Sequence, residues 1–125
     1  MTPVDPDERQ LTEIAELAAT HDGPIVMLNL NKYRDHAEYM RYGEVALRVL
    51  DRIGGRVLWR TDVKQTVIGD ESDSYDEVIA VLYPSPAAFL SFATDEEIAA
   101  ARALRTSGLE RAALICCEPG DGVLA

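Results

Sequence analysis

Two asparagines interrupt an otherwise apolar segment near the start of the chain. In PIVMLNLNKY, residues 24–33, Asn29 and Asn31 stand where a buried strand would carry aliphatic side chains. Successive side chains of a strand point to opposite faces, so both amides share a face with Ile25 and Met27. A buried amide without a hydrogen-bond partner costs free energy, although it can both donate and accept. We therefore expect Asn29 either to contact a ligand in a cavity or to pair within the protein.

The same alternation suggests which face of this strand the helices cover. Val26, Leu28 and Leu30 form a purely apolar face, which we expect to pack against helices. The face with the two amides is then expected to border a partly hydrated cavity. Asn31 lies close to the end of the strand, so capping the next turn is the alternative to a ligand contact.

Aromatic and basic side chains supply further candidates for this pocket. Trp59, in GGRVLWRT, is expected either as a core ring or as one wall of the pocket. Arg56 and Arg60 are expected on the strand face opposite Trp59, where two guanidinium groups are either solvated or hold a carboxylate. Tyr39 and Tyr42 lie three residues apart on a predicted helix. They either pack that helix on the sheet or direct a phenol into the pocket.

His36 is the candidate catalytic residue, because an imidazole with an ordinary pKa near 6.5 suits general acid–base catalysis. Its position on the first turn of a predicted helix makes solvent exposure the alternative. His21 is expected in a turn, and the histidines and acids match no metal-ligand spacing. The chain also lacks the GxGxxG, P-loop and GxSxG motifs. We expect neither a metal nor a cofactor, and no motif names a reaction.

Composition limits the partners of the chain. Its 125 residues suit one domain, and 22 acids against 12 bases give a formal net charge of −10, which disfavours nucleic acid. No apolar run approaches the roughly 20 residues that span a bilayer, and the amino terminus lacks the features of a secretory signal. We expect no membrane partner and a cytoplasmic location. Cys116 and Cys117 are expected to be small buried strand residues without a disulfide.

Apolar periodicity and turn residues predict an alternation of helices and strands. Thr61 and Asp62 are expected to form a turn, and Thr94 with Glu97 is expected to cap a helix as a capping box. The predicted helices are 7–20, 36–53, 86–93 and 94–107, and the predicted strands are 24–33, 56–61, 63–68, 77–83 and 111–117.

This order predicts an α+β fold of the ferredoxin-like βαββαβ type with an extra N-terminal helix. The expected organisation is a helical extension over residues 1–22, the domain over 23–118 and a tail over 119–125. Helices would cover one face of the antiparallel sheet, so the other face would expose apolar area unless a second copy packs on it. We therefore expect a homodimer through the sheet face.

Several segments, in their order and spacing, resemble a known bacterial family. GPIVMLNLNKY, YMRYG, GGRVLWR, YDEVIAVLYPSPAAFLSF and RTSGLERAALI resemble the domain-of-unknown-function family 1330, in the dimeric α/β-barrel superfamily, over residues 23–118. The resemblance implies a two-fold dimer whose sheets enclose a cavity. The superfamily includes cofactor-free monooxygenases, dehydrating cyclases and isomerase-like enzymes. Where relatives are expected to carry His-Arg, this chain has Leu104-Arg105, which removes a titrating group from an inherited acid–base mechanism.

The expected function is the binding of a small organic metabolite by a homodimeric α/β barrel, with cofactor-free isomerase, cyclase or oxygenase chemistry. The alternative is a non-catalytic dimerisation or ligand-sequestering module. The candidate catalytic residue is His36, and the candidate ligand-binding residues are Asn29, Asn31, Trp59, Arg60, Tyr39 and Tyr42.

Overall fold

The computed structural model describes residues 4–120, so the ends of the predicted extension and tail lie outside the described residues. Four helices, four strands and one short 3-10 turn follow one another along the chain. In order they are α1 (Glu8–Thr20), β1 (Ile25–Tyr33), α2 (His36–Arg52), β2 (Arg56–Asp62), η1 (Glu71–Asp73), β3 (Glu77–Tyr83), α3 (Pro86–Ala93), α4 (Glu96–Gly108) and β4 (Leu109–Cys117).

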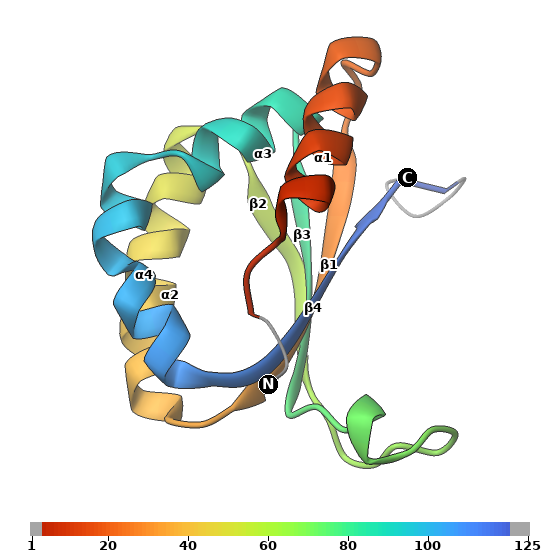
Figure 1. Cartoon of the computed structure of the whole chain (residues 1–125), viewed down its shortest axis with the longest axis vertical. Helices are drawn as coiled ribbons and strands as arrows, with labels where there is room; N and C mark the ends of the chain where they lie inside the picture. The colour runs from red at the N-terminus through yellow and green to blue at the C-terminus, as the bar shows by residue number, and fades with distance from the viewer. Residues whose placement is uncertain (1–3, 121–125) are drawn as a thin grey trace.

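The four strands form one antiparallel sheet in the order β2-β3-β1-β4, with the helices α2 and α4 on one side of it (Figure 1). Each βαβ unit places its helix on this same side, and α1 packs beside α3. The predicted α+β ferredoxin-like fold with an additional N-terminal helix is confirmed. No helix within residues 4–120 is long and apolar enough to cross a membrane.

Short polar side chains begin the helices. Asp7 accepts a hydrogen bond from the backbone N–H of Gln10, and Ser85 accepts one from that of Ala88, which satisfies donors that have no partner inside a helix. The predicted capping box at Thr94 is wrong. Asp95 instead caps α4, because Thr94 still belongs to the last turn of α3 and donates to its carbonyls.

The prediction of a strand over residues 63–68 is also wrong. β2 continues through the predicted turn at Thr61 and ends at Asp62, which pairs with Glu77 at the start of β3. Beyond this pair no neighbouring strand is left for residues 63–68, and a strand is stable only when it bonds to a neighbour. Val67 and Ile68 are 84% and 93% exposed.

The helices cover the face of β1 that carries the asparagines, so the predicted assignment of the two faces is reversed. Ile25 and Met27 are 2% and 3% exposed and pack against Leu50 of α2. Val26, Leu28 and Leu30 lie on the opposite face, which no helix of the described chain covers. We call this the open face. Its apolar residues are Val26, Leu28, Leu30, Trp59, Val78, Ala80, Leu82, Ala113 and Ile115.

A bulge in β2 decides which of its side chains reach the helix-covered face. The register against β3 shifts by one residue just before Trp59, which lies opposite Ala80 on the open face. Arg60 lies opposite Ile79 and therefore points to the helix side, whereas Arg56 lies on the open face. The prediction that both arginines share a face opposite Trp59 is wrong, because simple alternation does not hold across the bulge.

Candidate functional site

Two buried polar side chains meet on the helix-covered face of the sheet. Asn31 of β1 and Glu77 of β3 are direct partners in the strand register and are 2% and 1% exposed. The amide nitrogen of Asn31 donates to a carboxylate oxygen of Glu77 at 3.0 Å and to the phenolic oxygen of Tyr39 at 2.9 Å. Asn31 is thus held by two neighbours rather than by the next turn.

Arg60 supplies the positive charge that this buried carboxylate needs. Its Nε donates to the second carboxylate oxygen of Glu77, and its Nη2 donates to Asp62 at 2.8 Å and to the phenolic oxygen of Tyr33 at 3.3 Å. An unpaired carboxylate in this position would be strongly unfavourable. The bulge that turns Arg60 toward the helices therefore also makes the burial of Glu77 possible.

Three phenols line the cluster from β1 and α2. The ring centroids of Tyr33 and Tyr39 are 5.6 Å apart, and those of Tyr39 and Tyr42 are 5.9 Å apart. Burial, followed by the nearby Glu77 carboxylate, raises the pKa of Tyr33 to about 12 and also raises the pKa of Tyr39. Burial likewise raises the pKa of Tyr42. All three phenols therefore stay protonated and can donate hydrogen bonds at neutral pH.

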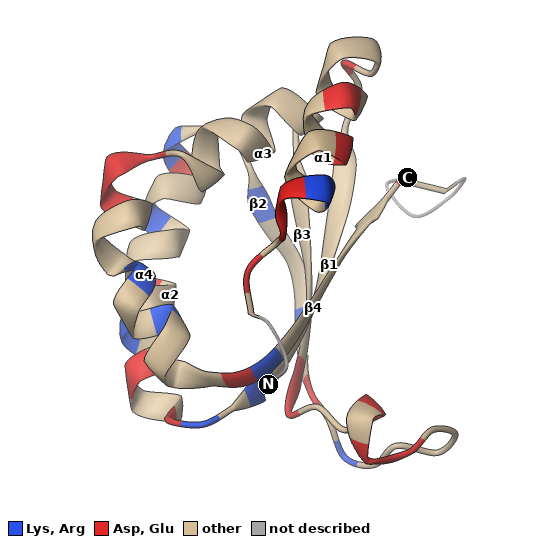
Figure 2. Ribbon diagram, in the orientation of Figure 1, with Lys and Arg blue, Asp and Glu red and all other residues tan. Residues whose placement is uncertain are grey.

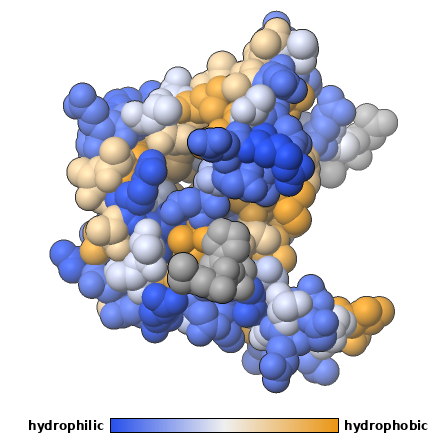
Figure 3. Space-filling view, in the orientation of Figure 1, coloured by the Kyte–Doolittle hydropathy of each residue, from blue (hydrophilic) through white to orange (hydrophobic). Residues whose placement is uncertain are grey.

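Asn29 borders a space that the helices leave uncovered. It is half-buried, and its amide nitrogen donates to the carbonyl of Met27 at 3.2 Å, while its own carbonyl oxygen has no partner among the described residues. Its neighbour on β4, Leu114, lies on the same face yet is 43% exposed. Figure 3 shows an opening in the helical layer between α1 and the pair α2 and α4. We call this space the sheet hollow, bordered by Asn29, Asn31, Tyr39, Tyr42 and Leu114.

The structure brings only part of the predicted site together. Asn31, Arg60 and Tyr39 meet around Glu77, and Tyr42 and Asn29 lie beside them. His36 is exposed and stacks on the ring of Tyr33 at 4.4 Å, so it reaches the cluster through that phenol. Trp59 is 46% exposed on the open face and takes no part.

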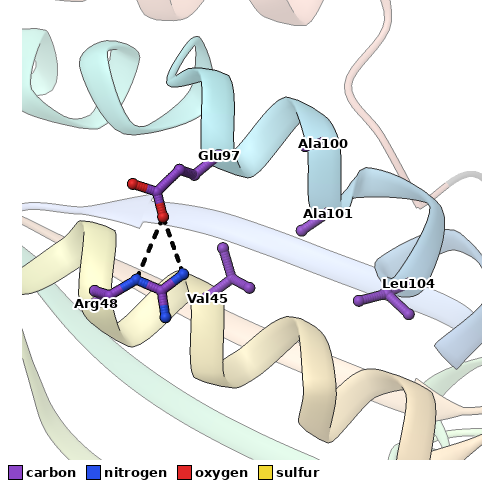
Figure 4. Close-up of a pocket in the computed structure, with 6 residues that line it drawn as sticks. All are labelled: Val45, Arg48, Glu97, Ala100, Ala101 and Leu104. Carbon is purple, nitrogen blue, oxygen red and sulfur yellow. Dashed lines mark hydrogen bonds and ion pairs between the residues drawn. The ribbon is translucent and has the colours of Figure 1, made fainter.

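A groove between α2 and α4 is a second concave feature, of about 300 Å³. Its only charged lining residues, Arg48 and Glu97, form an ion pair at 3.0 Å (Figure 4), and acids and bases also alternate along both helices (Figure 2). Its charged groups already satisfy each other, and its other lining residues are aliphatic. Its residues are Val45, Arg48, Glu97, Ala100, Ala101 and Leu104. Leu104, at the position where a histidine was expected in relatives, thus adds apolar lining here.

A smaller cavity of about 200 Å³ lies between the end of α1 and β4, beside His21, Cys116 and Cys117. Both cysteines are free, as expected, but Cys116 is exposed because β4 is an edge strand. Partial burial raises the pKa of the Cys116 thiol, followed by the effect of Cys117, which opposes thiolate formation. Within residues 4–120 no group of three His, Cys, Asp or Glu side chains is arranged to hold a metal.

Glu77→Gln is expected to lower the free energy of unfolding by about 2 kcal/mol, because the amide removes the charge that Arg60 contacts. Arg60 is 40% exposed, so water screens part of this pair and limits the loss. Urea unfolding measures the effect. Asp62→Asn is the matched control, since its carboxylate also contacts Arg60 but is 76% exposed, and its loss should stay within about 0.5 kcal/mol. Equal losses for both variants would contradict this role of Glu77.

Comparisons with known proteins support the fold and the family. Among solved structures, the chain is similar to RPA0582 of Rhodopseudomonas palustris, a protein of unknown function, with 28% identity, a TM-score of 0.88 and coverage of 97% of this chain and 99% of that one. The hydroxynitrile lyase of Passiflora edulis has 10% identity, a TM-score of 0.60 and coverage of 80% and 96%. A dimeric ferredoxin-like protein of unknown function from Jannaschia sp. CCS1 has 15% identity, a TM-score of 0.52 and coverage of 78% and 100%.

The last two similarities show the fold alone, because their identities are low. A search of curated proteins gives no match. The model of a family described as Domain of unknown function (DUF1330) matches residues 25–118, about three quarters of the chain. The chain therefore belongs to the DUF1330 family.

Proposed function

We propose that the protein binds a small organic molecule in the sheet hollow and holds an oxygen atom of that molecule, such as a carbonyl oxygen, with the phenol of Tyr39. One observation carries this proposal. The phenolic oxygen of Tyr39 accepts a hydrogen bond from Asn31, and its own proton has no acceptor among the described residues. That proton is therefore available to a ligand in the hollow.

The surroundings of Tyr39 suit this role. Its raised pKa keeps the phenol neutral, and a neutral donor in a partly desolvated site binds a carbonyl oxygen without the cost of burying a charge. Asn29 offers a second polar group on the same face of β1, and Leu114 offers apolar contact area. This mixture of apolar lining and few polar groups is typical of small-molecule sites.

A phenol beside a carbonyl oxygen also stabilises the negative charge that develops there when an enolate forms. This chemistry is common to the isomerase, cyclase and oxygenase classes that the sequence suggested. The similarity to a hydroxynitrile lyase is in keeping with a fold that can host catalysis. Both oxygens of Glu77 already accept hydrogen bonds, and His36 is exposed on the far side of Tyr33, so the geometry supports ligand binding better than any one reaction.

We further propose that the open face is the interface of a homodimer. Its residues are almost entirely apolar, and Trp59 and Ile115 are 46% and 48% exposed in the single chain. A continuous apolar face of this kind is rarely left in water. The similar protein from Jannaschia sp. is described as dimeric. Sedimentation equilibrium should find twice the chain mass, and a single species of 13.8 kDa at micromolar concentration would contradict the dimer.

Asn29→Leu is expected to leave the melting temperature nearly unchanged and to weaken ligand binding about 5- to 150-fold, which corresponds to about 1–3 kcal/mol. The amide of Asn29 contacts only a carbonyl of its own strand, so folding loses little when it is replaced. The ligand is first identified by screening the wild-type protein against a library of carbonyl-bearing metabolites for thermal stabilisation. Isothermal titration of a hit against both proteins then gives the change in affinity.

Asn31→Leu and Tyr39→Phe complete this test. Asn31→Leu removes the amide between Glu77 and Tyr39, so it should lower stability by about 1–3 kcal/mol even without ligand. Tyr39→Phe keeps the ring and removes only the phenolic hydroxyl, so it should lose affinity with little change in fold. A loss of stability in Asn29→Leu with unchanged affinity in Asn29→Leu and Tyr39→Phe would overturn the proposed site. If no compound of the library binds, the non-catalytic dimerisation module becomes the better description.

A further inference from the structure

Residues 63–76, which join β2 to β3, form a projection that we call the arm. It contains the predicted strand that did not form, the 3-10 turn η1 and the acidic stretch that precedes β3. Val67 and Ile68 lie in this projection and are 84% and 93% exposed, the largest values among the exposed large apolar side chains of the described chain. Two adjacent aliphatic side chains in full contact with water call for an explanation, because they add nothing to the core.

The arm is fastened to the sheet rather than loosely attached. Arg111 of β4 donates to the backbone carbonyls of Glu71 and Ser74, and its guanidinium lies 5.0 Å from the ring centre of Tyr75. At the base of the arm, the N–H of Val63 donates to the carbonyl of Asp76 at 2.9 Å. These contacts hold the arm in a fixed direction from the sheet.

That direction is the side of the open face. Figure 1 shows the arm, in green, projecting from the ends of β2 and β3 on the side of the sheet away from α2 and α4. Figure 3 shows an apolar patch at the end of this projection. A second copy that packs on the open face would lie directly beside the arm.

We infer that the arm clasps the second copy of the chain, with Val67 and Ile68 packed against the opposite end of the partner sheet. This inference rests on the proposed dimer. The arm carries four acids and one lysine, so its occupant should offer positive charge. At its own end of the open face, Lys32 already pairs with Asp76 at 3.5 Å, and Arg111 is held by the arm. At the other end, Arg56 is exposed and makes no ion pair within residues 4–120.

The symmetry of a dimer decides between the two ends. A two-fold axis along the strands would bring the two acidic arms to the same end, where they would repel each other. An axis across the strands places β2 against β2 in the reverse direction. The arm of each copy, at the Asp62 end of β2, then lies over the Arg56 end of its partner. Charge complementarity favours this second arrangement.

The clasp is tested with Ile68→Asp in the full chain. Because Ile68 is 93% exposed, this variant should keep the wild-type melting behaviour of the monomer, while the dimer dissociation constant from sedimentation equilibrium should rise more than 10-fold. Leu47→Asp is the matched control, since Leu47 is 56% exposed on α2, away from the open face. Its dissociation constant should equal that of the wild type.

A charge exchange tests the proposed partner end. Arg56→Glu and Glu71→Arg should each weaken the dimer about 3- to 10-fold, because each places like charges together, and the double variant should restore affinity to within about 2-fold of the wild type. Equal dissociation constants for Ile68→Asp and Leu47→Asp would overturn the clasp and leave the dimer standing. Strictly additive losses in the double variant would overturn the arrangement across the strands. A monomeric wild type would overturn both the dimer and the clasp.

Discussion

Met27→Asp is expected to unfold the protein, whereas Val26→Asp should leave a folded monomer. Met27 is 3% exposed in the core cluster beside Leu50, where a carboxylate would find neither a cation nor water. The cost is about 4 kcal/mol or more, a large part of the 5–15 kcal/mol that holds a typical domain together. Urea unfolding followed by circular dichroism measures the loss.

Val26, the neighbour of Met27 in sequence, is the matched position on the opposite face. In a single chain its side chain is half-buried on the open face, where an aspartate can reach water. In the proposed dimer the same carboxylate would be buried against the partner, so Val26→Asp should sediment at 13.8 kDa where the wild type is dimeric. If Val26→Asp unfolds the protein and Met27→Asp does not, the helices cover the other face of β1.

Gly108→Ala is expected to lower the free energy of unfolding by about 3 kcal/mol, and it should also weaken ligand binding. A Cβ atom at Gly108 would lie 2.7 Å from the backbone nitrogen of Tyr39 and 2.8 Å from its Cα. The carbonyl of Gly108 accepts hydrogen bonds from the N–H groups of Arg34 and Asp35 at 2.8 and 3.1 Å, so the end of α4 and the start of α2 are in backbone contact. A methyl group must push these segments apart, and overpacking of this kind is costly.

Gly43 provides the control for this substitution. It lies in the middle of α2, and a Cβ atom there would meet nothing within 4 Å. Gly43→Ala should therefore raise the free energy of unfolding by about 0.5–1 kcal/mol, as alanine is favoured over glycine inside a helix. Urea unfolding of both variants measures the difference. A Gly108→Ala protein as stable as Gly43→Ala would show that the contact between α4 and α2 can relax without cost.

The order of helices and strands could be predicted from local patterns. Apolar residues recur at helical spacing along α2, and Gly54 follows that helix, while the continuous apolar run EVIAVLY forms β3. These patterns depend on neighbours a few residues apart, which the sequence shows directly. Residues 63–68 have a similar composition, but they form no strand because no neighbouring strand is positioned to bond with them.

The site was predicted only in part. The amide of Asn31 is conspicuous in an apolar strand, and it does lie in the buried cluster. Glu77 was missed, because a glutamate at the start of a strand is usually exposed, and only its position opposite Asn31 reveals that it is buried. Arg60 reaches Glu77 because of the bulge in β2, which no local pattern of residue types indicated.

The sequence alone determined the ferredoxin-like order of elements, the segments that alternate between two faces, and the presence of two amides among aliphatics in β1. Tertiary structure decided which face the helices cover, since Ile25 and Met27 are as apolar as Val26 and Leu28 and both faces could have been buried. It also decided that Trp59 lies on the open face and Arg60 on the other. The physical reason is that periodicity depends on short-range geometry, whereas the choice of face depends on which surfaces of distant elements fit together.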